Sequence, residues 1–337
     1  MKNMEFAMVR VANKSLDNLV LIKENGYSNT VEKEIRPYLD TICDKGTMVS
    51  SYGHEIYYEH FNNPSAKGCV VILHGFTEGI LKYSEIIYTF IKQGYEVFMI
   101  EHFGHGASTR NKEVLDDLSK VSVDDFEIYV DDVIRFTNTV VKKSKKAEKL
   151  YLFGHSMGGG IAARVIEKES KLFDKCVLSS PMIGVNMGAL PYPIGRALAA
   201  IMVKLGRKYD YVLGHHKFSD DGDFEHSPDK SRERYNYFEK IKRENDRYKS
   251  NGATWSWVNS ALKATSQIVK EARKIIIPTL LLQAEVDHSV RKDSQVKFAA
   301  KVPSCDIVEI KGSKHEIMFS SDSVNLMFWS EFFSFLG

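Results

Sequence analysis

One short segment of the chain has residue types and spacing that could support nucleophilic catalysis. Ser156 lies in a Gly-x-Ser-x-Gly pattern that is completed by Gly154 and Gly158. The apolar run 149–153 precedes the pattern, and the helix-compatible run 161–168 follows it. A strand that turns sharply into a helix presents its central serine at the edge of a sheet, and glycine tolerates the close approach and dihedral angles of such a turn. The pattern also fits an ordinary glycine-rich turn, so it needs support from elsewhere in the chain.

A nucleophilic serine needs a base and an acid that orients the base. On a strand-to-helix turn of this kind, the three residues follow in the order serine, acid, histidine. His315 is the last histidine of the chain and comes just after the apolar run 306–310. Asp287 follows the strand candidate 275–283 and is expected at its carboxyl end, whereas the rival Glu285 lies nearer to the strand. The sequence therefore predicts a catalytic triad of Ser, Asp and His with Asp287 as the acid.

The negative charge that develops on a carbonyl oxygen must be stabilised by hydrogen-bond donors. One donor is expected from the backbone of Met157, which follows the nucleophile, and the other from the loop after an earlier strand. In that loop, Gly75 would let the chain turn so that the Phe76 N–H faces the oxyanion, with His74 and Glu78 in supporting positions. Each such donor contributes about 3–4 kcal/mol to transition-state stabilisation.

Apolar runs alternate with segments of helical periodicity along most of the chain. Continuous apolar strands that alternate with helices predict a parallel sheet covered on both faces, that is, an α/β fold. Two further strands, 47–51 and 55–61, flank a turn at Gly53 and predict an opening antiparallel hairpin. The remaining strand candidates are 69–73, 96–100, 149–153, 175–179, 275–283 and 306–310, and the helix candidates between them are 83–93, 123–141, 158–168 and 293–301.

The alternation is interrupted once, by about 95 residues between the strands near 180 and 275, which is several times a normal connection. Apolar residues at helical spacing over 194–205, and a tryptophan-containing helical pattern over 254–268, predict helices in this segment. We therefore expect an inserted helical cap. The predicted organisation is a polar, helical N-terminal extension over 1–45, an α/β core over 46–181 and 273–337, and a helical cap over 182–272.

The composition is that of an ordinary globular protein. Of the 337 residues, 43% are hydrophobic and 27% are charged, and the net charge of +2 gives no general attraction to nucleic acid. The histidines and acid at His74, Glu78, His102 and His105 could suggest a metal cluster, but such residues more commonly brace loops, so we expect neither metal nor cofactor. The four cysteines form no C-x-x-C pair and indicate neither a disulfide framework nor a zinc site. They are Cys43, Cys69, Cys176 and Cys305.

The beginning of the sequence gives an expectation about location. Residues 1–14 contain no apolar stretch long enough for a signal peptide, and no window approaches the roughly 18 apolar residues of a membrane-spanning helix. We therefore expect a cytoplasmic protein.

These motifs together resemble the α/β-hydrolase fold. Within it, the chain is most similar to the bacterial lysophospholipase and monoacylglycerol lipase group, in particular to inner-membrane-associated lysophospholipases of Gram-negative bacteria. The resemblance covers nearly the whole chain after residue 45. The blocks that carry it are HGFTEGILKYSEI (74–86), GHSMGG (154–159), PTLLLQAEVDHSV (278–290), IKGSKHEIMF (310–319) and, in the predicted cap, NGATWSWVNSAL (251–262).

One departure from the family pattern lies at residues 101–108. The family usually has Asp-x-Arg-Gly-His-Gly-x-Ser there, and this chain has Glu101 and Phe103 in place of the acid and the arginine. The triad is unaffected. We expect the contacts of the missing arginine, and with them headgroup preference, to change, and Phe103 to make the wall beside the active site more apolar.

The resemblance implies hydrolysis of carboxylic esters of single-chain lipids, either lysophospholipid or monoacylglycerol, through an acyl-enzyme on Ser156. A short-chain carboxylesterase and a serine aminopeptidase share the fold and triad. A peptidase would need acids for the substrate amine, and the acidic segment 220–225 is a candidate, although an exposed loop is the simpler interpretation. An acyltransferase is a further alternative. A catalytically silent ligand receptor is the alternative from another class, but such proteins typically lose a triad residue.

The predicted cap also suggests partners. It would supply an apolar slot for an acyl chain, and the basic residues around the helix 194–205 could contact an anionic membrane surface on the inner face. The sequence does not indicate an oligomeric state.

Overall fold

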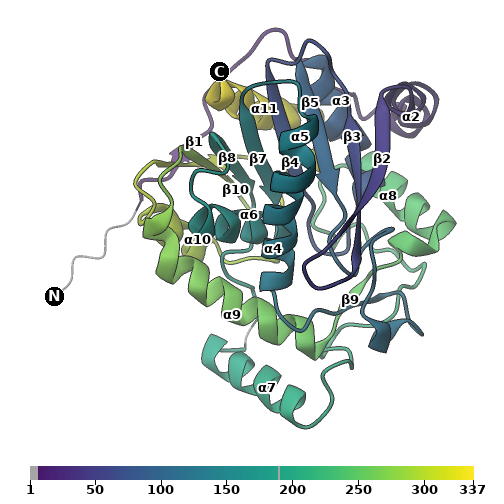
Figure 1. Ribbon diagram of the computed structural model, residues 1–337, viewed down its shortest axis with the longest axis vertical. Coiled ribbons are helices and arrows are strands. Elements are labelled where there is room, and N and C mark those ends of the chain that lie inside the picture. Colours follow the sequence, from purple (N-terminus) through teal and green to yellow (C-terminus); the bar gives the residue numbers. More distant parts are fainter. Residues whose placement is uncertain (1–6, 189) are drawn as a thin grey trace.

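A mixed sheet forms the centre of the protein (Figure 1). The computed structural model describes residues 7–188 and 190–337, and in these residues nine strands pair in the order β1-β11-β10-β8-β7-β4-β5-β3-β2. The pairs β2–β3 and β3–β5 are antiparallel and all the others are parallel, which confirms the predicted fold class. The strands are β1 (Arg10–Val11), β2 (Cys43–Val49), β3 (Glu55–Phe61), β4 (Gly68–Leu73), β5 (Tyr95–Ile100), β7 (Leu150–His155), β8 (Lys175–Ser179), β10 (Thr279–Ala284) and β11 (Cys305–Ile310).

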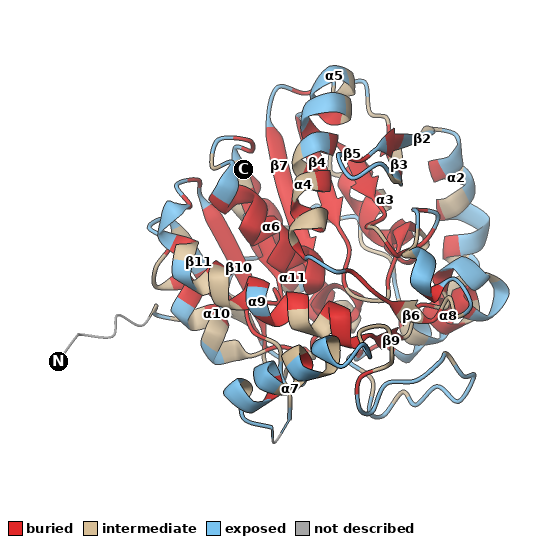
Figure 2. Cartoon of the chain, turned by 60° about the horizontal axis from the view of Figure 1, so that its bottom comes forward, coloured by how far each residue is buried: buried red, intermediate tan, exposed pale blue. Residues whose placement is uncertain are grey.

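Helices cover both faces of this sheet, so that its central strands are buried throughout (Figure 2). Successive side chains of a strand point to opposite faces. Val70 and Ile72 accordingly join the core beneath α3 and α11, and Val71 and Leu73 join the core beneath α4 and α6. The covering helices are α3 (Ser84–Lys92), α4 (Glu127–Phe136), α6 (Met157–Lys168), α10 (Lys292–Ala299) and α11 (Asp322–Leu336).

The inserted segment contains three longer helices on the side of the sheet where the parallel strands end. These are α7 (Tyr192–Lys204), α8 (Arg232–Glu244) and α9 (Trp255–Glu271). Ser231 and Thr254 cap the N-termini of α8 and α9, and each side chain accepts a hydrogen bond from a backbone N–H of the first turn. Helix α7 packs on α9, whereas α8 lies apart from them beside α1 (Tyr27–Thr30) and the short helix η2 (Ile80–Tyr83) (Figure 1). The division into core and cap domains stays a prediction.

Several elements differ from the sequence predictions. Among the described residues 7–45, helical structure is limited to 27–40, and Arg10–Val11 is instead a strand, because it pairs with the outer edge of β11. Strand β10 begins at Thr279 and not at 275, since Pro278 has no N–H for a sheet ladder. Helices α8 and α11 and the small sheet of β6 (Lys120–Val121) with β9 (Gly252–Ala253) were not predicted. No helix among the described residues is long and apolar enough to cross a membrane.

A buried ion pair fastens α8 to the sheet domain. The Arg234 guanidinium donates two hydrogen bonds of 2.8 Å to the Glu85 carboxylate on α3, and each side chain is only 1% exposed. Its remaining N–H groups donate to the carbonyl oxygens of Ile22 and Ser320, so the guanidinium links α8 to three other segments. A buried pair in which every donor is used holds its elements in one geometry.

We expect Arg234→Met to lower the free energy of unfolding by about 3–5 kcal/mol, because the Glu85 charge would stay buried without its partner. Chemical denaturation measures this loss. Lys240→Ala is the matched control on the same helix, because Lys240 pairs with Glu32 at the surface, with the two side chains 35% and 39% exposed. A loss in Lys240→Ala equal to that in Arg234→Met would contradict the anchoring role.

Candidate active site

Ser156 lies at the turn between β7 and α6, as the sequence predicts. Its φ of +51° falls in a region that side chains other than glycine rarely adopt. Hydrogen bonds from both directions fix this conformation: the Ser156 N–H donates to the Ser179 carbonyl at 3.0 Å, and the Met182 N–H donates to the Ser156 carbonyl at 2.8 Å. Such a residue costs of order 1–3 kcal/mol and persists only where its surroundings determine it.

The glycines around the turn are required by close backbone contacts. A Cβ at Gly158 would lie 2.2 Å from the carbonyl oxygen of Leu73 on β4, and a Cβ at Gly154 would lie 2.4 Å from the carbonyl oxygen of Gly158. Helix α6 therefore approaches β4 and β7 closely enough to bring the N-terminus of the helix beside the serine.

The structure brings Ser156, His315 and Asp287 into one hydrogen-bonded chain. His315 Nε2 lies 2.8 Å from Ser156 Oγ, and His315 Nδ1 lies 2.7 Å from Asp287 Oδ2. Asp287 follows β10 and His315 follows β11, so the three side chains come from the carboxyl ends of three strands. The carboxylate requires a proton on Nδ1, and Nε2 is then the acceptor for the serine hydroxyl. Glu285 instead accepts from Lys311 and from the Gly312 N–H, at 3.1 and 2.8 Å.

The charge of Asp287 is stabilised by its surroundings. Burial alone would raise its pKa, but His315 and the backbone N–H groups of Val290 and Ser289, both 2.9 Å from Oδ1, hold the pKa below its usual range. Asp287 is thus an anion that faces the imidazole, which is the arrangement that stabilises an imidazolium.

The loop after β4 is held in a fixed conformation beside the serine. His74 Nδ1 donates to the Gly75 carbonyl at 2.8 Å, and the Gly75 N–H donates to Glu78 Oε2 at 2.6 Å. Burial lowers the pKa of His74, so its neutral ring can also accept from the backbone at Nε2. The Phe76 ring packs on Trp257 of α9, with centroids 4.4 Å apart. Met157 is the first residue of α6, a position whose amide has no acceptor within the helix.

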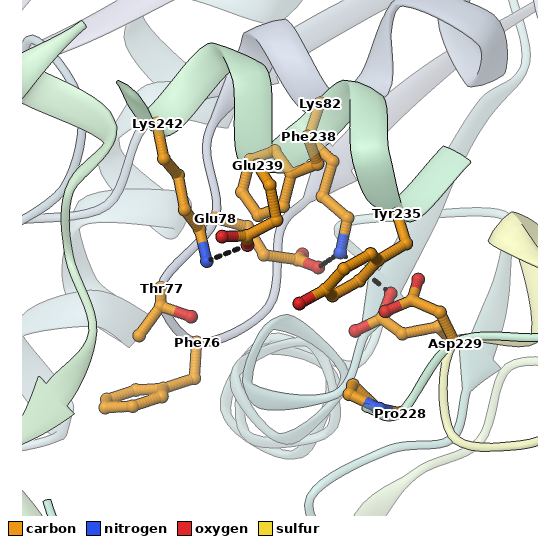
Figure 3. A pocket seen from close by; sticks show the side chains of 11 residues that line it. Phe76, Thr77, Glu78, Lys82, Pro228, Asp229, Tyr235, Phe238, Glu239 and Lys242 are labelled. Carbon is orange, nitrogen blue, oxygen red and sulfur yellow. Dashed lines mark hydrogen bonds and ion pairs between the residues drawn. The ribbon is translucent and has the colours of Figure 1, made fainter. Parts of the chain in front are cut away.

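A polar cavity of about 170 Å³ borders this loop, and the sequence motifs did not reveal it (Figure 3). In its wall Lys82 Nζ lies 2.5 Å from Glu78 and 2.9 Å from Glu316, the residue after His315. Burial lowers the pKa of Lys82, but the two carboxylates outweigh it, and the net pKa is raised. The four-residue spacing of Glu78 and Lys82 could have indicated their ion pair from sequence. Only the fold shows that α8 completes the cavity. The other lining residues are Phe76, Thr77, Pro228, Asp229, Tyr235, Phe238, Glu239 and Lys242.

Comparisons with known proteins agree with this geometry. The sequence profile of the family described as serine aminopeptidase, S33, matches residues 64–322. The chain is 30% identical over 273 residues to the Haemophilus influenzae protein named probable lysophospholipase L2, covering 80% of this chain and 84% of the relative. The chain belongs to the α/β-hydrolase family. Within it, this serine hydrolase groups with the lysophospholipases and monoglyceride lipases.

Two further relatives are similar to this hydrolase. Lysophospholipase L2 of Escherichia coli strain K12 is 29% identical over 263 residues, which is 76% of each chain. The crystal structure of a soluble variant of monoglyceride lipase from Saccharomyces cerevisiae, in complex with a substrate analogue, superposes with a TM-score of 0.66 at 16% identity, over 88% of this chain and 96% of that one. At 16% identity, the similarity to the yeast structure shows the fold alone.

The two residues of the hydrolase that depart from the family pattern lie in different places. Glu101 is fully buried and accepts hydrogen bonds from the Ile80 N–H at 3.0 Å and from the Tyr248 hydroxyl at 2.7 Å, so it ties the inserted segment to η2. Phe103 packs on the His54 ring, 4.4 Å between centroids, and is absent from the cavity wall. Its side chain contacts the β2–β3 hairpin, and the expectation that Phe103 makes the wall beside the active site more apolar stays a prediction.

One group among the described residues has ligand atoms close enough for a metal ion. His155, His315 and Glu316 each offer an atom within 4.8 Å of the others. However, both His315 nitrogens face triad partners, and Glu316 pairs with Lys82. Burial lowers the pKa of His155, but Glu316, 3.4 Å away, outweighs burial and raises it, so His155 favours the proton over a metal. This group belongs to the network of charges beside the triad.

We expect Asp287→Asn to lower kcat about 10³–10⁴-fold, because an amide neither selects the required histidine tautomer nor stabilises the imidazolium. Glu285→Gln is the control, two residues away, and should retain kcat within twofold. Steady-state hydrolysis of a p-nitrophenyl ester measures both. The reverse ranking of the two variants would reassign the acid.

Proposed function

We propose that the protein hydrolyses the carboxylic ester of single-chain lipids, lysophospholipids first and monoacylglycerols second, through an acyl-enzyme on Ser156. The observation that carries the proposal is the hydrogen-bonded chain from Ser156 Oγ through His315 to Asp287. The two bacterial relatives named lysophospholipase L2 support the first substrate class, and the name of the yeast structure supports the second.

The proposed reaction uses only side chains and amides of this site. Ser156 Oγ attacks the ester carbonyl while His315 Nε2 takes its proton, and Asp287 stabilises the imidazolium. The Phe76 and Met157 amides donate to the oxyanion. His315 then protonates the leaving alcohol, and a water molecule that is activated by the same imidazole releases the fatty acid from Ser156.

The surroundings of Phe76 suit an amphipathic ester. On one side its ring contacts Trp257 of α9, and the residue also lines the cavity that contains Lys82 and Glu78. An ester carbonyl held by the Phe76 amide would thus lie between aromatic and charged surfaces, which are the two environments that a single-chain lipid ester needs.

A serine aminopeptidase is the second candidate, because the acid-rich cavity could hold a substrate amine. The segment 220–225, considered from sequence, does not serve this purpose. Its acids are exposed, and three of them pair with basic side chains at the surface: Asp220 with Arg243, Asp223 with His226, and Glu225 with Arg232.

We expect Ser156→Ala to lose at least about 10³-fold of kcat on a lysophospholipid and to escape labelling by a fluorophosphonate probe that labels the wild type. The substrate panel consists of a lysophospholipid, a monoacylglycerol, a short-chain p-nitrophenyl ester and an aminoacyl amide. A wild type that hydrolyses the amide best would favour the aminopeptidase. A wild type that takes no label would favour a silent receptor.

We also propose that α7 contacts an anionic membrane surface. Its outward face carries an apolar stripe at helical spacing, in which Ile194, Ile201 and Leu205 are 55%, 52% and 67% exposed, and Figure 2 shows this helix at the margin of the molecule. Residues 190–217 contain five lysines and arginines but one acid, Asp210. An exposed apolar stripe that is flanked by cations is the pattern of a helix that lies in a lipid interface.

The double substitution Ile201→Glu with Leu205→Glu should weaken co-sedimentation with phosphatidylglycerol-containing vesicles at least tenfold, because two side chains that would be buried in lipid become anionic. The control is Leu326→Glu, an exposed leucine on α11 at the far side of the sheet. Wild-type binding should fall as salt is raised. Equal binding by the wild type and the double variant would contradict the membrane contact.

A further inference from the structure

The polar cavity beside the triad has an unusual balance of charges. Four carboxylates and two lysines line it: Glu78, Asp229, Glu239, Glu316, Lys82 and Lys242. Lys82 is paired with Glu78 and Glu316, and Lys242 Nζ lies 3.0 Å from Glu239. Both cations are therefore engaged, and the cavity has an excess of negative charge.

Asp229 is the carboxylate without a partner. It is 7% exposed, and no other described residue donates a hydrogen bond to its carboxylate oxygens or forms an ion pair with them. Figure 3 shows Asp229, Tyr235 and Lys82 directed into the same space. A buried carboxylate without donors is costly, and the cost is removed by a ligand that supplies them.

The chemistry of such a ligand follows from what the cavity lacks. A carboxylate without hydrogen-bond donors, in a cavity where four carboxylates face two lysines that are already paired, favours a group that is rich in N–H donors and positively charged, which describes a primary ammonium group. Phe76, whose amide would hold the ester carbonyl, and Asp229 both line the cavity, and Figure 3 shows them on different sides of it. A headgroup that leaves the ester on this side would therefore enter the cavity that Asp229 lines.

We infer that the cavity binds the headgroup of the substrate and that Asp229 accepts hydrogen bonds from a primary ammonium group at its end. The inference rests on the proposed function. It makes Asp229 a specificity-determining residue that favours ethanolamine-type lysophospholipids over monoacylglycerols. Quaternary ammonium headgroups bind less well, because they have no N–H to donate.

The first test compares substrates in Asp229→Asn. We expect kcat/KM on lysophosphatidylethanolamine to fall at least tenfold, mainly through KM, while kcat/KM on a monoacylglycerol and on a p-nitrophenyl ester stays within twofold. Because the variant removes a buried charge that has no partner, its melting temperature should equal or exceed that of the wild type. The control is Asp223→Asn, which alters an exposed acid of the preceding loop and should leave kcat/KM on both lipid substrates unchanged.

The pH dependence gives a second readout. Burial raises the pKa of Asp229 to about 7, with Glu316 and Glu78 adding to the shift and Lys82 and Lys242 opposing it. The carboxylate is thus charged above pH 7 and neutral below. The ratio of kcat/KM on lysophosphatidylethanolamine to that on monoacylglycerol should fall about tenfold per unit below pH 7 in the wild type, and stay flat in Asp229→Asn. The catalytic steps are common to both substrates, so pH effects on these steps cancel in the ratio.

Binding can be tested apart from lipid hydrolysis. Glycerophosphoethanolamine should competitively inhibit p-nitrophenyl ester hydrolysis by the wild type, at least tenfold more weakly in Asp229→Asn, whereas glycerophosphoglycerol should inhibit both alike. If lysophospholipids are not hydrolysed but this inhibition depends on Asp229, the proposed function fails and the ammonium site stands. The inference would be overturned if Asp229→Asn lowered kcat/KM equally on all substrates or only on aminoacyl amides. It would also be overturned if glycerophosphoethanolamine inhibited the variant as strongly as the wild type.

Discussion

The ion triplet of Lys82 with Glu78 and Glu316 is the interaction on which the site depends. Glu78 holds the Gly75 amide and with it the loop that carries Phe76, and Glu316 directly follows His315. One buried cation thus connects the loop after β4 with the loop after β11, which are 234 residues apart along the chain. Without this cation, both carboxylates would be buried without their shared partner, which is strongly destabilising. Because Lys82 also forms the cavity wall, the position of the triad and the charge of the neighbouring cavity have the same origin.

The inserted segment is attached to the sheet domain in two different ways. Helix α8 is fixed by the Arg234–Glu85 pair and brings Tyr235, Glu239 and Lys242 to the cavity, so the polar side of the site has a defined shape. Helix α7 packs on α9 but presents its apolar stripe to solvent. Satisfied buried hydrogen bonds favour one arrangement, whereas an exposed apolar face gains stability only when something covers it. The half that is held by the buried ion pair therefore borders the proposed headgroup cavity, and the half with the exposed apolar stripe is the one proposed to contact lipid.

The sequence predicted those features that follow from periodicity and from the ends of strands. Ser156, Asp287 and His315 could be grouped because parallel strands place their carboxyl ends at one edge of the sheet, and the apolar runs gave the six core strands. Two kinds of feature escaped prediction. Helix α8 has a mostly charged sequence in which Tyr237, Phe238 and Ile241 join the apolar core. The pairing of Lys82 with Glu316 joins residues that no local pattern relates. The strand at Arg10–Val11 is set by the open edge of β11 and not by its own two residues.

The buried charges of this protein are of two physical kinds. Arg234 donates to Glu85 and to the carbonyl oxygens of Ile22 and Ser320, so the burial of this ion pair is compensated within the fold, and the pair holds α8 in place. Asp229 has no such compensation, and its raised pKa near 7 expresses the cost of keeping it ionised. A fold loses stability by enclosing an acceptor without donors, and regains it only when a bound group supplies them. The uncompensated charge of Asp229 lines the same cavity as Phe76, whereas the compensated pair joins α8 to α3. The first kind of buried charge therefore serves binding, and the second serves the fold. A polar cavity with every charge paired would instead bind neutral and cationic headgroups nearly alike.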